Sequence, residues 1–270
     1  MAHRHSHGSG VLMLDSLAAH SGLRNVSPGL KTGFCVLVLL LCVGASDTVV
    51  GIFVALSMVF FMGFLGKTPM GHIVRLLKIP LLFLCVSCLV ILLEVVREPL
   101  GLWQLKVGSW WLCVTSESLH RAVTLFFQAM GAVCCLYALS STTPIPQIIE
   151  VLRRCHVPEL VIELMYLIYR YLFVLLEVQR QLTVAATARL GYVDLRRSVS
   201  TAGRVSGTLL ASSFRRSRVC FDAMESRGYD GKLAFLSHAP RLRPTHLLAA
   251  AAYVLALLGL IFVRKGWLCP

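Results

Sequence analysis

The sequence predicts an all-α integral membrane protein, a bundle of about five transmembrane helices with a cytoplasmic coupling module of two to three helices. The chain of 270 residues is 57% hydrophobic, and its mean hydropathy of +0.75 is far above that of soluble domains. The apolar residues also gather into runs close to the roughly 20 residues that a helix needs to cross a bilayer. A dense basic stretch before the last run predicts the coupling module.

Five apolar runs are the predicted spans: 33–45, 49–65, 81–96, 122–139 and 247–263. At about 1.5 Å per residue the first run is short for a full crossing. Tilting, local thinning of the membrane or a place inside the bundle would accommodate it. The predicted organisation is an N-terminal cytoplasmic segment, four transmembrane helices, the coupling helices, and a last span with the C-terminus, over residues 1–32, 33–141, 142–244 and 245–270.

The distribution of Lys and Arg predicts which side of the membrane each loop occupies. With five spans, the N-terminus, the loop after Leu65 and residues 142–244 share one side, which carries most of the basic residues. We assign this side to the cytoplasm. Arg264 and Lys265, after the last span, depart from the rule. The opposite side has the loop 97–120, whose interfacial anchors are Trp103, Trp110 and Trp111.

The net charge of +13 indicates an anionic partner. The position of the basic residues beside the membrane indicates which class of partner it is. Between Thr187 and Arg243 there are eleven Lys or Arg residues and four Asp or Glu residues. A basic face next to a bilayer meets anionic lipid or an acidic partner more often than nucleic acid. We therefore expect membrane lipid as a partner and no nucleic acid.

The basic stretch predicts three helices. Thr142-Thr143-Pro144 caps a short helix through Arg154, a second helix runs over 158–189, and a third over 200–227. The first half of the second helix is almost apolar enough to span a membrane, but three charges recur on one face at intervals of seven: Glu163, Arg170 and Glu177. Each charge in hydrocarbon costs about 2.5–3.5 kcal/mol. A bundle with Arg170 between the carboxylates avoids part of this cost, and so does an interfacial location, which we favour.

The third helix has two different faces. Its apolar stripe comprises Leu210, Phe214, Phe221 and Met224. Its charged face comprises Arg204, Arg215, Arg218 and Asp222. The small residues Gly203 and Gly207 predict the close approach of a neighbouring helix.

Two Arg-Gly signatures end the second and third helices: Thr187-Ala188-Arg189-Leu190-Gly191-Tyr192 and Ala223-Met224-Glu225-Ser226-Arg227-Gly228-Tyr229-Asp230-Gly231. In each, we expect the Gly to take the left-handed conformation that stops the helix. The Arg then lies against the negative pole of the helix dipole, and its planar fork can still reach a carboxylate on another protein. Such helix ends suit docking and not chemistry. Together the two ends predict paired tips on one partner surface.

These signatures resemble the T component of the energy-coupling factor transporters, most closely its cobalt-type CbiQ branch. The similarity extends from Leu14 to the last span. Other segments that carry it are Leu14-Asp15-Ser16-Leu17-Ala18, Leu23-Arg24, 28–31, and Tyr169-Arg170-Tyr171 followed by Glu177. The resemblance implies a non-catalytic scaffold of the bacterial cytoplasmic (inner) membrane, with its N-terminus and coupling region in the cytoplasm.

The resemblance also implies partners and a mechanism. Coupling helices dock on two ABC-type ATPase subunits, and the membrane part holds a substrate-capture subunit, with a small accessory membrane subunit as an open alternative. ATP-driven closure of the ATPases moves the coupling helices, and the capture subunit then releases cobalt inward. Carried over by position, Arg189 and Arg227 pair with ATPase carboxylates, and Gly191 and Gly228 end the helices so that these side chains project.

The other docking residues implied by the resemblance flank the two Arg residues. Ala188, Ala223 and Met224 let the helix ends seat closely, and Asp230 bonds nearby backbone amides. The first signature departs from the tighter Ala-Arg-Gly form of the family because Leu190 is inserted.

Several alternatives stay open at this point. The same role in a nickel or vitamin importer fits the same architecture. A stand-alone permease would need ionisable groups deep in several spans, and an intramembrane enzyme would need a polar catalytic pair, for which the sequence offers no candidate. We expect no catalytic residue, no cofactor and no metal site. The alternating His3, His5 and His7 could bind a divalent metal weakly, but a solvated tail is the preferred interpretation.

Overall fold

The computed structural model describes residues 26–66, 68–92, 94–96, 103–107, 110–231 and 244–268. The chain divides into two compact units. The described part of one unit covers 26–144 and 244–268, and that of the other covers 145–231.

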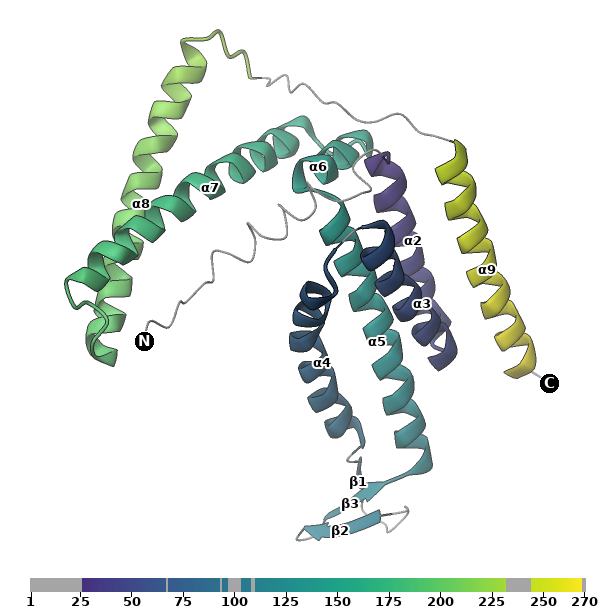
Figure 1. The fold of residues 1–270 in the computed structure, drawn as a ribbon. Helices are drawn as coiled ribbons and strands as arrows, with labels where there is room; N and C mark the ends of the chain where they lie inside the picture. The colour runs from purple at the N-terminus through teal and green to yellow at the C-terminus, as the bar shows by residue number, and fades with distance from the viewer. Residues whose placement is uncertain are drawn as a thin grey trace. The chain divides into compact units, whose positions relative to one another are not determined.

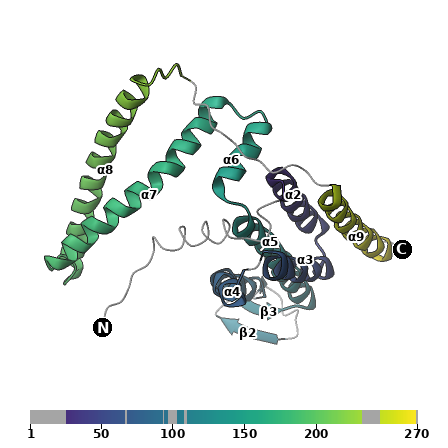
Figure 2. The same ribbon diagram turned by 45° about the horizontal axis from the view of Figure 1, so that its top comes forward.

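Five helices of the first unit are long and apolar enough to cross a membrane. They are α2 (Pro28–Ala45), α3 (Thr48–Phe60), α4 (Met70–Leu92), α5 (Ser116–Thr142) and α9 (Pro244–Leu268), and a π-helical turn, η1 (Phe61–Leu65), extends α3 (Figure 1). α5 packs against α2, α3 and α4, while α9 packs against α2 and α3. Figure 2 shows α3 and α5 side by side in this bundle. The protein is therefore a multi-pass helical membrane protein, and the predicted fold class is confirmed.

Several helix ends differ from the predicted ones. α2 begins at Pro28 instead of residue 33, so it has 18 residues and is not a short span. α4 covers Met70–Leu92 instead of 81–96 and contains Pro80 in its interior. Hydropathy missed its first turns because they carry basic residues, and proline is tolerated inside transmembrane helices. α5 begins with a capping box between Thr115 and Ser118, which satisfies its first backbone amides.

A small antiparallel sheet connects α4 to α5, where the sequence analysis expected a loop. Its strands are β1 (Glu94–Val96), β2 (Trp103–Val107) and β3 (Trp110–Val114), in the order β1-β3-β2. In the register, Glu94 is opposite Cys113 and Trp103 is opposite Val114. The strands are rich in aromatic and β-branched residues, which favour a pleated conformation. This signal was present in the sequence and was not used.

The backbones of α3 and α5 are in direct contact at two glycines. A Cβ atom on Gly51 would lie 2.6 Å from the carbonyl carbon of Phe127, and one on Gly131 would lie 2.9 Å from the carbonyl oxygen of Gly51. Real Cβ atoms do not approach backbone atoms so closely, so only glycine fits here. Close backbone approach through small residues is typical of helix pairs in membranes. The core around this crossing includes Val50, Val54 and Cys134, all buried.

A buried lysine in the first span caps the end of another span. Lys31 is 3% exposed, and its Nζ donates a hydrogen bond of 3.1 Å to the carbonyl oxygen of Thr142. Thr142 is the last residue of α5, where carbonyl groups have no partner within the helix. The charge inside the bundle is thus held by a backbone acceptor at the negative end of a helix.

Arg264, which departs from the predicted distribution of basic residues, has a partner in the loop between α2 and α3. Its Nε donates to Asp47 Oδ2 at 2.9 Å and its Nη2 donates to Asp47 Oδ1 at 3.3 Å. Asp47 also accepts from the backbone N–H of Val49 and so caps α3. The hydrogen bond from Arg264 is the main cause that lowers the pKa of Asp47 below its usual value. This bidentate pair joins α9 to the start of α3.

The Asp47→Asn variant should lose a small part of its stability at pH 7, because solvent screens the pair with Arg264, which is 43% exposed. Asn keeps the helix cap, so the loss reports the charge of Asp47 together with its second acceptor for Arg264. A lowered carboxyl pKa stabilises the fold above the unfolded pKa and ceases to do so as pH falls through the folded pKa. Thermal unfolding in detergent should therefore show a deficit at pH 7 that disappears in acid. The exposed pair Glu117–Arg121 provides a control, and an equal loss in Glu117→Gln would contradict this expectation.

Candidate docking site

The second unit consists of three helices close to those predicted from the sequence. They are α6 (Ile145–Arg154), α7 (Glu159–Ala188) and α8 (Leu195–Glu225). α8 begins five residues before the predicted start at Ser200, with Asp194 in the N-cap position, a residue type preferred there. α7 is not among the five candidate spans. Among the described residues Arg170 forms no ion pair, and Glu177 pairs with Arg180 at 3.4 Å.

α7 and α8 form an antiparallel hairpin. The turn of residues 189–194 joins the end of α7 to the start of α8 (Figure 1). At the other end of the hairpin, Tyr229 Oη donates to Glu163 Oε2 at 3.3 Å. Arg189 and Arg227 thus lie at opposite ends, about 40 Å apart by the helical rise of 1.5 Å per residue. The expectation of paired tips on one surface is wrong, because a short connection makes consecutive helices antiparallel.

Both signatures end their helices with the same pair of backbone hydrogen bonds. In the first, Leu190 N–H donates to Thr187 O and Gly191 N–H donates to Ala186 O, both at 3.0 Å. In the second, Gly228 N–H donates to Glu225 O at 3.0 Å and Tyr229 N–H donates to Met224 O at 3.1 Å. This is the Schellman arrangement, which satisfies the last carbonyls of a helix. In each case the Arg directly precedes the residue at the left-handed position.

The residue at the left-handed position differs between the two signatures. Gly228 has φ +77°, as expected, but in the first signature Leu190 takes this conformation with φ 56°, and Gly191 does not. Gly191 is required for a different reason. A Cβ atom there would lie 2.9 Å from both Ala186 O and Thr201 Oγ1, and Thr201 Oγ1 donates to Gly191 O at 2.9 Å. The inserted Leu190 thus ends α7, and Gly191 lets α8 pack against the turn.

Substitutions at the two left-handed positions should have opposite effects on stability. Leu190→Gly removes a left-handed conformation that is unfavourable for a residue with a Cβ, and should stabilise the hairpin by about 0.5–1 kcal/mol. Gly228→Ala creates the same strain and should destabilise it by about 1 kcal/mol. Thermal unfolding of the purified chain measures both. Gly203→Ala, in open space within α8, is the control and should be neutral or stabilising; destabilisation by Leu190→Gly would contradict the assignment.

The structure brings only part of the predicted docking set together. Ala223, Met224, Arg227 and Gly228 line a cleft between α7 and α8, whereas Ala188, Arg189 and Gly191 lie at the turn. The side chains of Arg189, Arg227 and Asp230 are exposed. Within the described residues neither Arg189 nor Arg227 forms an ion pair. Both guanidinium groups are therefore available to carboxylates of another protein.

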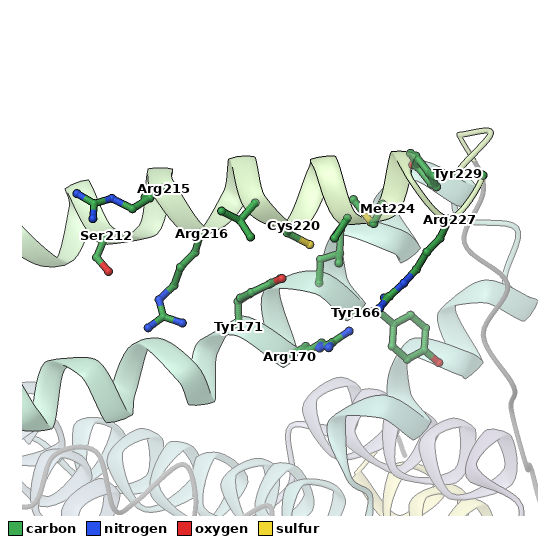
Figure 3. A pocket seen from close by; sticks show the side chains of 14 residues that line it. Tyr166, Arg170, Tyr171, Ser212, Arg215, Arg216, Cys220, Met224, Arg227 and Tyr229 are labelled. Atoms are coloured by element: carbon green, nitrogen blue, oxygen red, sulfur yellow. The ribbon is translucent and has the colours of Figure 1, made fainter.

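The cleft between α7 and α8, here called the arginine groove, has a volume of about 790 Å³. Four arginines line it, together with three tyrosines (Figure 3): Arg170, Arg215, Arg216, Arg227, Tyr166, Tyr171 and Tyr229. The sequence analysis did not predict the groove. The signal for it was the helical spacing of Ser212, Arg216 and Cys220, which places them on one face of α8.

All three tyrosines of the groove have a raised pKa, and for Tyr166 the main cause is burial. For Tyr171 the main cause is its hydrogen bond with Cys220, followed by burial, while the charges of Arg170 and Arg216 act in the opposite direction. For Tyr229 the causes are desolvation and then the nearby charge of Glu163. These phenols therefore stay protonated at neutral pH and act as hydrogen-bond donors. Tyr229 thereby holds the end of the second signature against the first turns of α7.

A comparison with known protein families shows which family the chain belongs to. Residues 19–237 match the family described as CbiQ, cobalt transport protein. The chain belongs to the CbiQ family of cobalt transport proteins. It is thus a multi-pass membrane component of cobalt transport, and the family resemblance of its Arg-Gly signatures is confirmed.

Named CbiQ proteins and a fused relative match most of the chain. The cobalt transport protein CbiQ of Rhodobacter capsulatus is 28% identical over 236 residues, which are 87% of this chain and 91% of that protein. CbiQ of Salmonella typhimurium is 29% identical over 158 residues, 58% of this chain and 70% of that protein. A protein of Methanocorpusculum labreanum named "Putative fused cobalt transport protein CbiMQ" is 28% identical over 249 residues. These 249 residues are 92% of this chain and 42% of the fused protein, so this chain spans less than half of the fused protein's length.

Possible metal ligands are dispersed in the described part of the chain. No three His, Cys, Asp or Glu side chains come together there as a metal-binding group. The buried cysteines pack between α2 and α5, where Cys135 Sγ donates to Cys35 O at 3.0 Å. The alternating His3, His5 and His7 lie outside the described residues.

Proposed function

We propose that this chain is the transmembrane coupling subunit of an energy-coupling-factor importer for cobalt ions. It transmits the ATP-driven motion of two ABC-type ATPase chains to a membrane subunit that captures the substrate, and is itself non-catalytic. The observation that carries the proposal concerns the ends of α7 and α8. Both helices end with the same pair of backbone hydrogen bonds. Each end also has an exposed Arg that forms no ion pair among the described residues. Because Arg189 and Arg227 lie at opposite ends of one hairpin, each suits a different ATPase chain.

The strength of such contacts fits a transmission role. Truncating one partner of a desolvated Arg–carboxylate pair costs about 2–5 kcal/mol. The planar guanidinium also holds a carboxylate in a fixed orientation through two parallel hydrogen bonds. Two such contacts would keep a pair of ATPase chains attached through a cycle of closing and opening. The α7–α8 hairpin would then move with the ATPases.

Two observations support cobalt and a capture partner. The family is described by cobalt transport, which favours cobalt over the nickel and vitamin alternatives. The Methanocorpusculum labreanum relative is named as a fusion, CbiMQ, and this chain covers 42% of it. The rest of that protein leaves room for a second component beside the CbiQ part. The basic residues of 142–244 support a cytoplasmic location of α6–α8 in the bacterial inner membrane.

Co-purification and transport test the proposal. The tagged chain is expressed with the ATPase and capture subunits encoded beside it, extracted in mild detergent and reconstituted into vesicles loaded with ATP on the ATPase side. We expect two ATPase chains per tagged chain, uptake of radioactive cobalt only when every component is present, and no uptake by this chain alone. Cobalt uptake by the isolated chain without ATP would instead identify a stand-alone permease.

A further inference from the structure

The arginine groove has a strong excess of positive charge. Its lining includes four arginines and no carboxylate, and among the described residues none of the four forms an ion pair. The four side chains are exposed, so solvent screens part of their mutual repulsion, but like charges gathered in one cleft still repel each other. An anion between them removes this repulsion.

Arginines from both helices line the groove, Arg170 from α7 and Arg215 and Arg216 from α8. In Figure 3, Arg216 points from α8 toward α7, and the side chains of Arg170 and Arg227 approach one another beside Tyr166. The charges of Arg170 and Arg216 both act on the phenol of Tyr171, so both lie near it. Guanidinium groups bind phosphate through two parallel hydrogen bonds each. The arrangement therefore fits a phosphate group that bridges α7 and α8.

Apolar side chains occupy the same groove and the adjoining helix surfaces. Leu167, Val219 and Met224 line the groove beside the arginines. On α7, a row of apolar side chains at helical spacing is exposed: Leu160, Leu164 and Ile168. The apolar stripe predicted on α8 is exposed as well, at Leu210, Phe214 and Phe221. A ligand with an anionic head and a hydrocarbon part matches this combination better than an inorganic ion does.

Chain connectivity limits the distance between Pro146 and the end of the span α5. Tyr166 Oη donates to the carbonyl oxygen of Pro146 at 3.5 Å, and Pro146 is four residues after Thr142, the end of the span α5. Four residues reach at most about 14 Å. The headgroup layer adds about 5–8 Å to each side of the hydrocarbon core. This link is short enough for a headgroup of the bilayer around α5 to contact the Tyr166 end of the groove.

We infer that the arginine groove binds the phosphodiester headgroup of an anionic phospholipid, with Arg170 and Arg216 as its principal ligands. The inference does not depend on ATPase docking, because neither arginine belongs to the two helix-end anchors. Binding would hold α7 and α8 together along their length, where the protein itself supplies few direct contacts between them.

The test uses the full chain, purified and delipidated in neutral detergent and titrated with phosphatidylglycerol or phosphatidylcholine. We expect phosphatidylglycerol to bind in preference. Arg170→Gln/Arg216→Gln should weaken it about 30-fold, since each interfacial basic residue contributes about one kilocalorie per mole to the attraction of anionic lipid. The matched control is Arg204→Gln/Arg218→Gln, which removes the same charge from exposed positions outside the groove and should change affinity less than threefold. Arg170→Lys/Arg216→Lys keeps the charge and should retain most of the binding even if the Gln variant folds poorly.

Three results would overturn the inference. The first is unchanged phosphatidylglycerol affinity in Arg170→Gln/Arg216→Gln. The second is full displacement of the lipid by millimolar sodium phosphate, which would make free phosphate the ligand. The third is loss of ATPase co-purification in this variant with lipid binding intact, which would assign the groove to the ATPase. Lipid binding is measured on the chain alone, so its failure is separate from a failure of the coupling role.

Discussion

Replacing both Arg189 and Arg227 by Glu is expected to abolish recruitment of the ATPase chains. Each substitution turns an attractive pair with a carboxylate into a repulsive one, and the two sites lie at opposite ends of the α7–α8 hairpin. Each single variant should therefore lose one ATPase chain and keep the other. The double variant should lose both, together with cobalt uptake. Quantified co-purification from membranes gives the stoichiometry directly.

The matched control for this experiment is Arg204→Glu/Arg218→Glu. It makes the same change of charge on exposed positions of α8 that lie away from both helix ends, and should keep both ATPase chains. Recovery of all variants in the membrane fraction shows that the spans still insert. Normal ATPase stoichiometry and transport in the Arg189→Glu/Arg227→Glu variant would refute the assigned roles.

The largest expected effect on stability is that of Gly51→Val. The added side chain would start 2.6–2.8 Å from backbone atoms of Phe127 and Gln128, which cannot move aside as a flexible side chain can. α3 and α5 must separate, and they form the most extensive helix contact of the bundle. We expect a loss of about 3 kcal/mol or more, measured by unfolding in mixed detergent micelles.

Gly44→Val is the control for this substitution, because a Cβ atom on Gly44 meets nothing within 4 Å. Gly131→Val should destabilise as Gly51→Val does. Since both variants separate the same two helices, the double variant should lose less than the sum of the single losses. A Gly51→Val protein as stable as Gly44→Val would show that the crossing can open at little cost.

Hydropathy was sufficient to predict the five spans but not their ends. A window of apolar residues excludes positions such as Lys31, although α2 continues through it because Lys31 finds a backbone acceptor on α5. The predicted span 81–96 began directly after Pro80, which lies inside α4. The sheet between α4 and α5 was missed because the aromatic residues of 103–114 were interpreted only as membrane anchors. In each case the observed structure depended on a contact with a residue distant in sequence, or on a second structural preference of the same residues.

The helix ends of the docking region could be predicted, but not their arrangement. Gly228 behaves as the general rule requires, whereas Leu190 takes the left-handed position in the first signature. The rule failed there because the position after Arg189 is fixed by hydrogen-bond geometry and not by residue type. The separation of Arg189 from Arg227 follows from the short turn between α7 and α8, and the connection length alone would have predicted it. The arginine groove forms where α7 and α8 face each other. The residue pattern of one helix does not predict which helix lies opposite it.

The bond from Lys31 to Thr142 has a mechanical consequence. Thr142 ends α5, and α6 begins only three residues later at Ile145, so any pull exerted through α6 arrives at this point. The ammonium group ties the point to the first turn of α2 as well. If the hairpin moves with the ATPase chains as proposed, its load therefore reaches α2 as well as α5.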